Sequence, residues 1–255
     1  MRYFICLCLT LSLIGCDKPE APKAVAVAPT PTVAVVQSVP PLVSTIEKYK
    51  KIKPKCQGEN CPNIEIEIDR FAADNVLTAL VERELVNMTA SLSDNKKIYA
   101  NFTELTADFW KKAENQWNVF LQSKVIYQKN NLIVLELNNE TYLGGAHGIG
   151  YTKYLNIDRK TQQIIPAAQL FIAAKEAEFW AKIQAQHQVW IKANELDDEH
   201  SIATWPFIQT NNVALTEKGV SVKYQNYDLA PYAFGQLEFS VPYEQLNGII
   251  NPTFL

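Results

Sequence analysis

An unbroken alternation of polar and apolar residues marks the stretch Asn63-Ile64-Glu65-Ile66-Glu67-Ile68-Asp69. A period of two is typical of a strand with one buried face, so we expect a strand here with its isoleucines facing inward. Apolar residues at three- and four-residue steps follow it and predict a helix of about five turns with one apolar face. The members of this repeat are Ala73, Val76, Leu77, Leu80, Val81, Leu85 and Met88.

Helical and strand patterns continue along the rest of the chain. A second helix is predicted to open at the cap Asn101, with Glu104 three residues on as in a capping box, and to carry one apolar side. That side comprises Leu105, Phe109, Ala113, Trp117, Phe120 and Leu121. A third helix is expected over 174–193, with Phe179, Ile183, His187 and Trp190 on one face.

Further strands are expected over 124–128, 132–140, 151–157, 205–209, 220–224 and 236–241, and a short helix over 242–246. Helices packed on such strands predict an α+β fold. We expect a mostly antiparallel sheet with long amphipathic helices, and a division into two lobes near residue 160 as one arrangement.

The composition excludes several classes of protein. The chain has 255 residues, of which 47% are hydrophobic and 20% charged, so disorder, collagen and a disulfide miniprotein do not fit. Lysine and arginine number 24 against 27 acidic residues, giving a formal charge of -3 without a basic block. We therefore expect no nucleic-acid partner.

The N-terminus resembles a bacterial lipoprotein signal peptide. Met1-Arg2 is followed by an apolar run over 3–13 and by Leu13-Ile14-Gly15-Cys16, which matches a lipobox. The run is shorter than the roughly 20 residues that span a bilayer. We expect residues 1–15 to be removed and Cys16 to be lipidated. The alternative is a plain secretory signal followed by a chance cysteine.

The remaining cysteines then form a pair. Cleavage removes Cys6 and Cys8 and acylation uses Cys16, which leaves Cys56 and Cys61. In an oxidising compartment we expect them to form a disulfide. A metal site is the competing interpretation, but two cysteines without a nearby histidine pair do not make a four-ligand zinc set.

Residues 16–45 are rich in proline, alanine and valine and cannot build a core. The 27 residues over 17–43, in an extended form, reach on the order of 80 Å. We expect a tether that presents a folded head away from a membrane, facing the periplasm or the exterior; a merely tolerated linker is the alternative. Asp17 after the lipidated cysteine resembles the inner-membrane retention signal of enteric bacteria, and the choice between inner and outer membrane stays open.

Motifs for chemistry are scarce. The three histidines, His147, His187 and His200, lie 40 and 13 residues apart, and neither spacing suits a paired ligand motif. The sequence has no His-Glu-x-x-His, Gly-x-Ser-x-Gly or phosphate-binding glycine motif. We assign no catalytic residue, metal or cofactor. His187 is expected to be a hydrogen-bonded core residue, and the acidic stretch over 195–199 a solvated loop rather than a cation site.

Two segments are unusual enough to suggest a binding surface. Residues 142–150 contain four glycines around His147, and residues 224–235 form an aromatic-rich loop between two predicted strands. Aromatic side chains held on a loop by a rigid sheet can form a binding surface. The candidate contacts are Tyr227, Pro231, Tyr232, Phe234 and His147. The alternative is that the rings fold back and cap the core.

These segments carry a family resemblance. Tyr142-Leu143-Gly144-Gly145-Ala146-His147-Gly148, Asn156-Ile157-Asp158 and Leu170-Phe171 resemble the central signature of the extracytoplasmic domain of RsiV-type anti-sigma factors. Residues 215–220, 227–235 and 239–243 are similar to that family in order and spacing. Upstream, about residues 60–145 resemble the small domain that precedes the catalytic unit in PdaC-type peptidoglycan deacetylases.

The resemblance implies a PdaC-like subdomain over 46–160 and an RsiV-like subdomain over 161–255. By analogy with RsiV it also implies recognition of lysozyme or another cell-wall ligand. Two departures matter: RsiV-type sensors add a cytoplasmic sigma-binding segment and a membrane helix, and the turn over 158–163 lacks the glycine usual after its threonine. The Asp and two His metal ligands of PdaC-type deacetylases belong to a separate domain, which is not expected here.

The favoured interpretation is a lipid-anchored, non-enzymatic binding protein that recognises lysozyme or peptidoglycan fragments and contacts the membrane only through its anchor. The alternatives are a glycan-modifying hydrolase using His147, a deacetylase-associated protein, and an accessory lipoprotein in envelope assembly.

Overall fold

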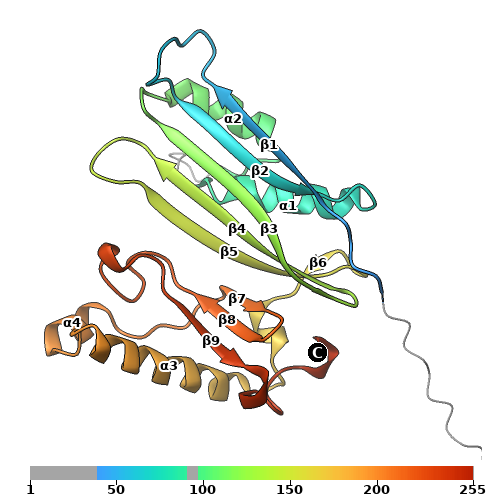
Figure 1. The fold of residues 1–255 in the computed structure, drawn as a ribbon, viewed down its shortest axis with the longest axis vertical. Helices are drawn as coiled ribbons and strands as arrows, with labels where there is room; N and C mark the ends of the chain where they lie inside the picture. Colours follow the sequence, from blue (N-terminus) through green and yellow to red (C-terminus); the bar gives the residue numbers. More distant parts are fainter. Residues whose placement is uncertain (1–38, 91–96, 255) are drawn as a thin grey trace, which may run out of the picture. The chain divides into compact units, whose positions relative to one another are not determined.

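Two β-sheets organise the structure, a computed structural model that describes residues 39–90 and 97–254 (Figure 1). The predicted signal peptide, Cys16 and the tether up to residue 38 lie outside the described residues. A six-stranded sheet has the order β1-β2-β3-β4-β5-β6, and a three-stranded sheet has the order β7-β8-β9. The strands of the larger sheet are β1 (Thr45–Ile52), β2 (Asn63–Arg70), β3 (Asn118–Lys129), β4 (Leu132–Tyr142), β5 (Ile149–Asp158) and β6 (Gln163–Ile164). Those of the smaller sheet are β7 (Val213–Leu215), β8 (Gly219–Lys223) and β9 (Glu238–Pro242).

The α+β class is confirmed, but the expected mostly antiparallel sheet is wrong for the larger sheet, which is mixed. Strands β2 and β3 pair in parallel, with Asn63 beside Asn118, while the other neighbouring strands pair antiparallel. The chain between β2 and β3 contains helices α1 (Asn75–Asn87) and α2 (Phe102–Lys112). A crossover of this kind returns the chain to the end of the sheet where it started, so the next strand runs parallel.

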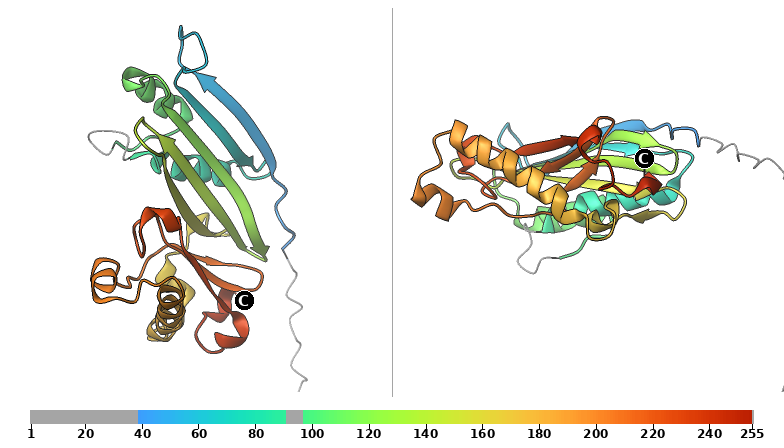
Figure 2. Two further views of the ribbon diagram at one scale, coloured as in Figure 1. Left: turned by 60° about the vertical axis from the view of Figure 1, so that its left-hand side comes forward. Right: turned by 90° about the horizontal axis from the view of Figure 1, so that it is seen from below.

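The alternation at β2 has the predicted effect. Ile64, Ile66 and Ile68 are buried in a core with α1 and α2, whereas Glu65 and Glu67 project from the other face. Both helices lie on the same face of the larger sheet (Figure 2). Burying an isoleucine is worth about 1.5–3 kcal/mol, so these three residues fix which face receives the helices.

Helices α1 and α2 are shorter than predicted. Helix α1 begins after Asp74, whose Oδ1 accepts a hydrogen bond from the Leu77 amide at 2.9 Å, so Ala73 lies outside it. Val76 belongs to the helix but is 62% exposed, not part of the apolar face. The structure does not clearly show the long amphipathic helices that the sequence predicted.

The second helix is capped as predicted but ends nine residues early. Asn101 Oδ1 accepts from the Glu104 amide at 3.0 Å, and the helix ends at Lys112. A residue with positive φ, Gln116, precedes β3, and Phe120 and Leu121 belong to that strand. Strand β3 therefore begins well before the predicted residue 124, because apolar residues here fit a period of two as well as a helical stripe.

The C-terminal half contains α3 (Glu176–Ala193), close to the predicted range, and α4 (Glu199–Thr204). Residues 205–209 do not form the predicted strand. The acidic stretch is not simply a loop, because Asp198 Oδ1 accepts from the Ser201 amide at 3.0 Å and caps α4. The short helix predicted over 242–246 is a 3₁₀ turn, Tyr243–Gln245. Strand β1 was not predicted, because most of its residues are exposed and show no alternation.

The predicted disulfide between Cys56 and Cys61 is present. It lies in the connection between the antiparallel strands β1 and β2. Gly58 has a φ of 101°, which a residue with a side chain rarely adopts, and so allows the turn inside the bridge. By loop-closure reasoning such a small ring contributes about 2 kcal/mol.

Side-chain amides join the free edge of β5 to the C-terminal half. The side-chain amide of Gln225 pairs with the backbone of Thr152 as a neighbouring strand would. Its Oε1 accepts from the backbone N–H of Thr152 at 3.0 Å, and its Nε2 donates to the Thr152 carbonyl at 2.7 Å. Asn212 Oδ1 accepts from the Tyr154 amide at 2.7 Å. Asn156 donates to the Val213 carbonyl at 2.7 Å and accepts from the Leu215 amide at 3.0 Å. We call these contacts of Gln225, Asn212 and Asn156 the amide stitches.

Within residues 39–90 and 97–254, no helix combines the length and the apolarity needed to cross a bilayer.

The amide stitches predict a large effect for one buried side chain. Asn156→Ala leaves the Val213 carbonyl and the Leu215 amide without their partner in a buried position, and a lost partner of this kind costs about 1–3 kcal/mol. We expect the free energy of unfolding, measured by urea denaturation, to fall by about 3 kcal/mol. The control Asn247→Ala removes an exposed amide with a long 3.4 Å hydrogen bond. A loss no larger in Asn156→Ala than in this control would contradict the account.

Candidate functional site

The glycine-rich segment forms the connection between β4 and β5. Gly144 and Gly145 have φ values of 87° and 92°, in the region that favours glycine. A Cβ on Gly148 would lie 2.9 Å from the Thr141 carbonyl oxygen, so glycine is needed for the close approach there. Tyr142 closes the loop by donating its hydroxyl to the Gly145 carbonyl at 2.9 Å. The loop leaves His147 exposed.

The aromatic-rich loop after β8 is anchored in the core at several points. Tyr224 is fully buried and donates its hydroxyl to the Ile208 carbonyl at 3.0 Å, and Leu229 and Ala230 are also buried. Burial raises the pKa of Tyr224 well above its usual value, so the hydroxyl stays a donor. Asp228 Oδ2 accepts a hydrogen bond from the backbone N–H of Gln225 at 2.7 Å. The loop is therefore held rigidly at both sides of its exposed rings.

Rings from three separate segments pack against one another in succession. The His147 and Tyr232 rings lie 4.0 Å apart at 20°, Tyr232 and Tyr227 lie 5.6 Å apart, and Tyr227 and Trp205 lie 6.3 Å apart at 23°. We call Trp205, Tyr227, Tyr232 and His147 the aromatic row. The Tyr232 hydroxyl donates to the Gly148 carbonyl at 2.8 Å, which fastens the aromatic loop to the glycine-rich loop.

The structure brings the five predicted contact residues to one region, but in different roles. His147, Tyr227 and Tyr232 belong to the aromatic row. Phe234 packs edge-on against Trp190 of α3, with centroids 5.2 Å apart, and Pro231 precedes the 3₁₀ turn Tyr232–Phe234. Because Tyr227 and Phe234 are 49% and 38% exposed, these rings do not simply cap the core.

The sequence did not predict the place of Trp205, which it assigned to a strand that the structure does not form. Trp190 packs against the C-terminal core on the face of α3 where it was expected. Trp190 is half-buried against Phe234, and Trp205 is half-buried beside Tyr227. The only local signal at Trp205 was an aromatic residue that follows a polar stretch.

The chemistry of the aromatic row favours binding. The recorded contacts of His147 are the Gly148 carbonyl, 3.1 Å from Nδ1, and the Tyr232 ring. Neither contact supplies the negative charge with which a carboxylate stabilises the protonated histidine of a hydrolase. In the part of the chain that the structure describes, no group of three or more His, Cys, Asp or Glu residues is placed to hold a metal ion. Flat, exposed rings can instead pack against a sugar ring or an apolar side chain.

His187 lies behind this surface, in the core. It is 2% exposed and is surrounded by the rings of Trp190, Phe207 and Phe239 at centroid distances of 5.7–6.4 Å. Burial lowers the pKa of His187, an effect only partly offset by a hydrogen bond with the Leu229 backbone. Its Nε2 has no hydrogen-bond partner. The neutral ring thus packs α3 against the base of the aromatic loop.

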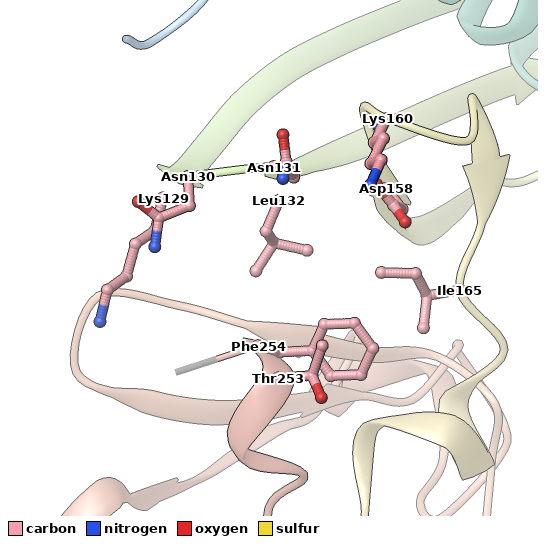
Figure 3. Close-up of a pocket in the computed structure, with 9 residues that line it drawn as sticks. All are labelled: Lys129, Asn130, Asn131, Leu132, Asp158, Lys160, Ile165, Thr253 and Phe254. Carbon is pink, nitrogen blue, oxygen red and sulfur yellow. The ribbon is translucent and has the colours of Figure 1, made fainter. Parts of the chain in front are cut away.

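Other hollows are built by different residues. One of about 280 Å³ is lined by the β3–β4 turn, the β5–β6 turn and the 3₁₀ turn Pro252–Phe254. In Figure 3, Leu132, Ile165 and Phe254 converge at its centre and Lys129 and Lys160 lie at its rim. It shares no residue with the aromatic row.

Fold and site together define an α+β protein with a row of packed aromatic rings held by two loops and Trp205, and the comparisons with known proteins place it in a family. A model described as protein of unknown function, DUF3298, matches residues 168–244, and one described as deacetylase PdaC matches residues 45–150. A crystal structure of a DUF3298 family protein from Pseudomonas aeruginosa PAO1 is 34% identical, covers 85% of this chain and 97% of its own, and gives a TM-score of 0.75. The chain belongs to the DUF3298 family.

A DUF3298 family structure from Bacteroides fragilis NCTC 9343 is 18% identical, covers 83% of this chain and 93% of its own, and shares the fold with a TM-score of 0.58. No curated protein matches the chain. The two family models suggest an extracytoplasmic, envelope-associated protein. The glycine-rich loop falls in the PdaC match and the aromatic loop in the DUF3298 match, so both contribute to the aromatic row.

The buried His187 predicts a pH dependence of stability. Because its folded pKa is below the ordinary value of 6.5, protonation favours the unfolded chain. This contribution is complete above about pH 6.5 and is lost as the pH falls toward the folded pKa, with a slope of at most about 1.4 kcal/mol per pH unit. His187→Phe should flatten the curve of unfolding free energy between about pH 6.5 and pH 5, measured by urea denaturation. Parallel curves for the two proteins would show that the core histidine does not resist protonation.

Proposed function

We propose that the chain is a lipid-anchored, extracytoplasmic binding protein that recognises lysozyme or a peptidoglycan ligand through the aromatic row. The observation that carries this proposal is the series of packed rings contributed by the two loops and Trp205, of which His147 and Tyr227 are exposed and Tyr232 and Trp205 half-buried. Aromatic residues that are preorganised and surrounded by well-packed neighbours are typical centres of binding energy.

The geometry favours binding over catalysis because the loop contacts fix ring positions rather than activate a nucleophile. The hydrogen bond from Tyr232 to Gly148 and the stacking on His147 hold the two loops together before any partner arrives. Rings that are already ordered lose little conformational entropy when they bind.

Four further features support an envelope partner. The resemblance to RsiV-type extracytoplasmic domains supports lysozyme as the ligand, and the resemblance to the PdaC-type domain supports a cell-wall ligand. The formal charge of -3 is compatible with a cationic protein such as lysozyme. The proline-rich tether after Cys16 would give the head reach from the membrane toward either partner.

A binding titration with a ring-deletion variant tests the proposal. Removing the central ring of the row by Tyr232→Ala should weaken binding to lysozyme or to soluble peptidoglycan fragments by about 30-fold, the size expected of a central aromatic contact. Val189→Ala is the matched control, because Val189 is exposed on α3 and belongs to no part of the row. Calorimetry on the folded chain would measure both affinities. Absence of binding to either ligand at about 1 mM, or equal affinities for the two variants, would overturn the proposal.

The lipid anchor has its own test. The wild-type chain, expressed in a bacterium with its leader, should stay in the membrane fraction through a high-salt wash and be released by detergent. Cys16→Ser removes the thiol that would carry the lipid, so that variant should leave the membrane fraction without detergent. Release of the wild type by salt alone would show that no lipid anchor is attached.

A further inference from the structure

The six-stranded sheet presents a polar surface on the side opposite α1 and α2. The two helices cover one face, as both views in Figure 2 show. On the other face, Leu132 and Val134 of β4 pack into the core of the C-terminal half, but the sheet beyond them carries polar side chains. Five of these side chains lie in register on consecutive strands: Lys48, Glu67, Gln122, Asn138 and Thr152.

Hydrogen bonds link these five residues across the whole sheet. Lys48 Nζ donates to Glu67 Oε1 at 2.6 Å, and Gln122 Nε2 donates to Glu67 Oε2 at 2.9 Å. Asn138 Nδ2 lies 3.4 Å from Gln122 Oε1, and the Thr152 hydroxyl lies 2.8 Å from Asn138 Oδ1. Thr152 at the end of the row is only 4% exposed, so the accessible part runs from Lys48 to Asn138. With strands about 4.8 Å apart, this part extends about 14 Å, long enough for a few sugar units.

A half-buried aromatic ring lies beside this row. Phe120 of β3 belongs to the same face as Gln122 and lines a hollow of about 250 Å³. The charged residues around that hollow are Lys48, Lys50, Glu65 and Glu67. The hollow thus combines the aromatic ring of Phe120 with hydrogen-bonding side chains.

Two ion pairs lie beside Phe120, and Glu140, directly across the β3–β4 ladder, adds a negative charge. Lys48 pairs with Glu67, and Lys50 pairs with Glu65, each directly across the β1–β2 ladder. The hydrogen bonds from Lys48 and Gln122 lower the pKa of Glu67, so it remains an acceptor at neutral pH. Paired charges with one carboxylate in excess offer hydrogen bonds but repel anions, which suits an uncharged ligand rather than a phosphate-rich one.

We propose that the accessible part of this surface, comprising Phe120 and the residues Lys48, Glu67, Gln122 and Asn138, binds a polysaccharide of uncharged pyranose units. A sugar ring packs its C–H face on Phe120, and its hydroxyl and amide groups exchange hydrogen bonds with the carboxylate and amide side chains beside it. We call it the glycan face. It shares no residue with the aromatic row, so the chain would hold a wall polymer and the partner of the aromatic row at separate sites.

The test uses the whole chain and an uncharged tetrasaccharide of β-1,4-linked N-acetylglucosamine, titrated by NMR or calorimetry. We expect saturable binding that changes little between low and high salt, because the tetrasaccharide carries no charge for salt to screen. Phe120→Ala and Gln122→Ala should each weaken it about tenfold. Unfolding midpoints establish that each variant is folded, and Gln122→Ala, which changes only a half-buried side chain, keeps the test available if Phe120→Ala unfolds.

Tyr232→Ala is the matched control for this surface. It should leave tetrasaccharide binding unchanged while it weakens binding at the aromatic row, so failure of one proposal is visible separately from failure of the other. The proposal is overturned if the wild type shows no saturable binding up to about 10 mM tetrasaccharide, or if folded Gln122→Ala binds as tightly as the wild type. Loss of tetrasaccharide binding in Tyr232→Ala alone would also overturn it, by placing the sugar on the aromatic row.

Discussion

The arrangement of both halves of the structure depends on the amide stitches along β5. The edge of an ordinary sheet ends in unpaired backbone groups, which attract another strand. Here Gln225 and Asn212 occupy those groups on Thr152 and Tyr154, while Asn156 reaches back to the backbone of β7. The larger sheet is thereby closed at this edge, and the smaller sheet is fixed beside it through directional hydrogen bonds rather than through apolar packing alone.

This constraint positions the aromatic row. Gln225 opens the loop that carries Tyr227 and Tyr232, and Thr152, its partner, lies a few residues after the glycine-rich loop that carries His147. A hydrogen bond between Gln225 and Thr152 therefore sets the separation of the two loops before their rings stack. Burying amides costs free energy unless each one is paired. The amide stitches therefore favour the placement of the two loops in which every buried amide has its partner.

Sequence reasoning succeeded where the signal is local. The isoleucine alternation at β2, the Asn101 cap, helix α3 and the disulfide are all properties of residues close together in the chain. It failed for β1, whose exposed edge residues show no period, and at Phe120 and Leu121, which fit a helix and a strand equally well. The amide stitches could not be predicted, because a glutamine or asparagine in the sequence does not indicate a partner about 60–70 positions away. For the same reason His147 and Tyr232 could be named as candidates, but not as neighbours.

We propose that the aromatic row, positioned by the amide stitches along β5, is the surface that meets an envelope partner. Hydrogen–deuterium exchange of the chain, measured with and without lysozyme and separately with soluble peptidoglycan fragments, tests this claim most directly. We predict that a bound partner slows exchange in residues 143–150 and 225–235 together, because both loops contribute rings to one surface. Binding that slows exchange only elsewhere in the chain, with these two loops unchanged, would contradict it.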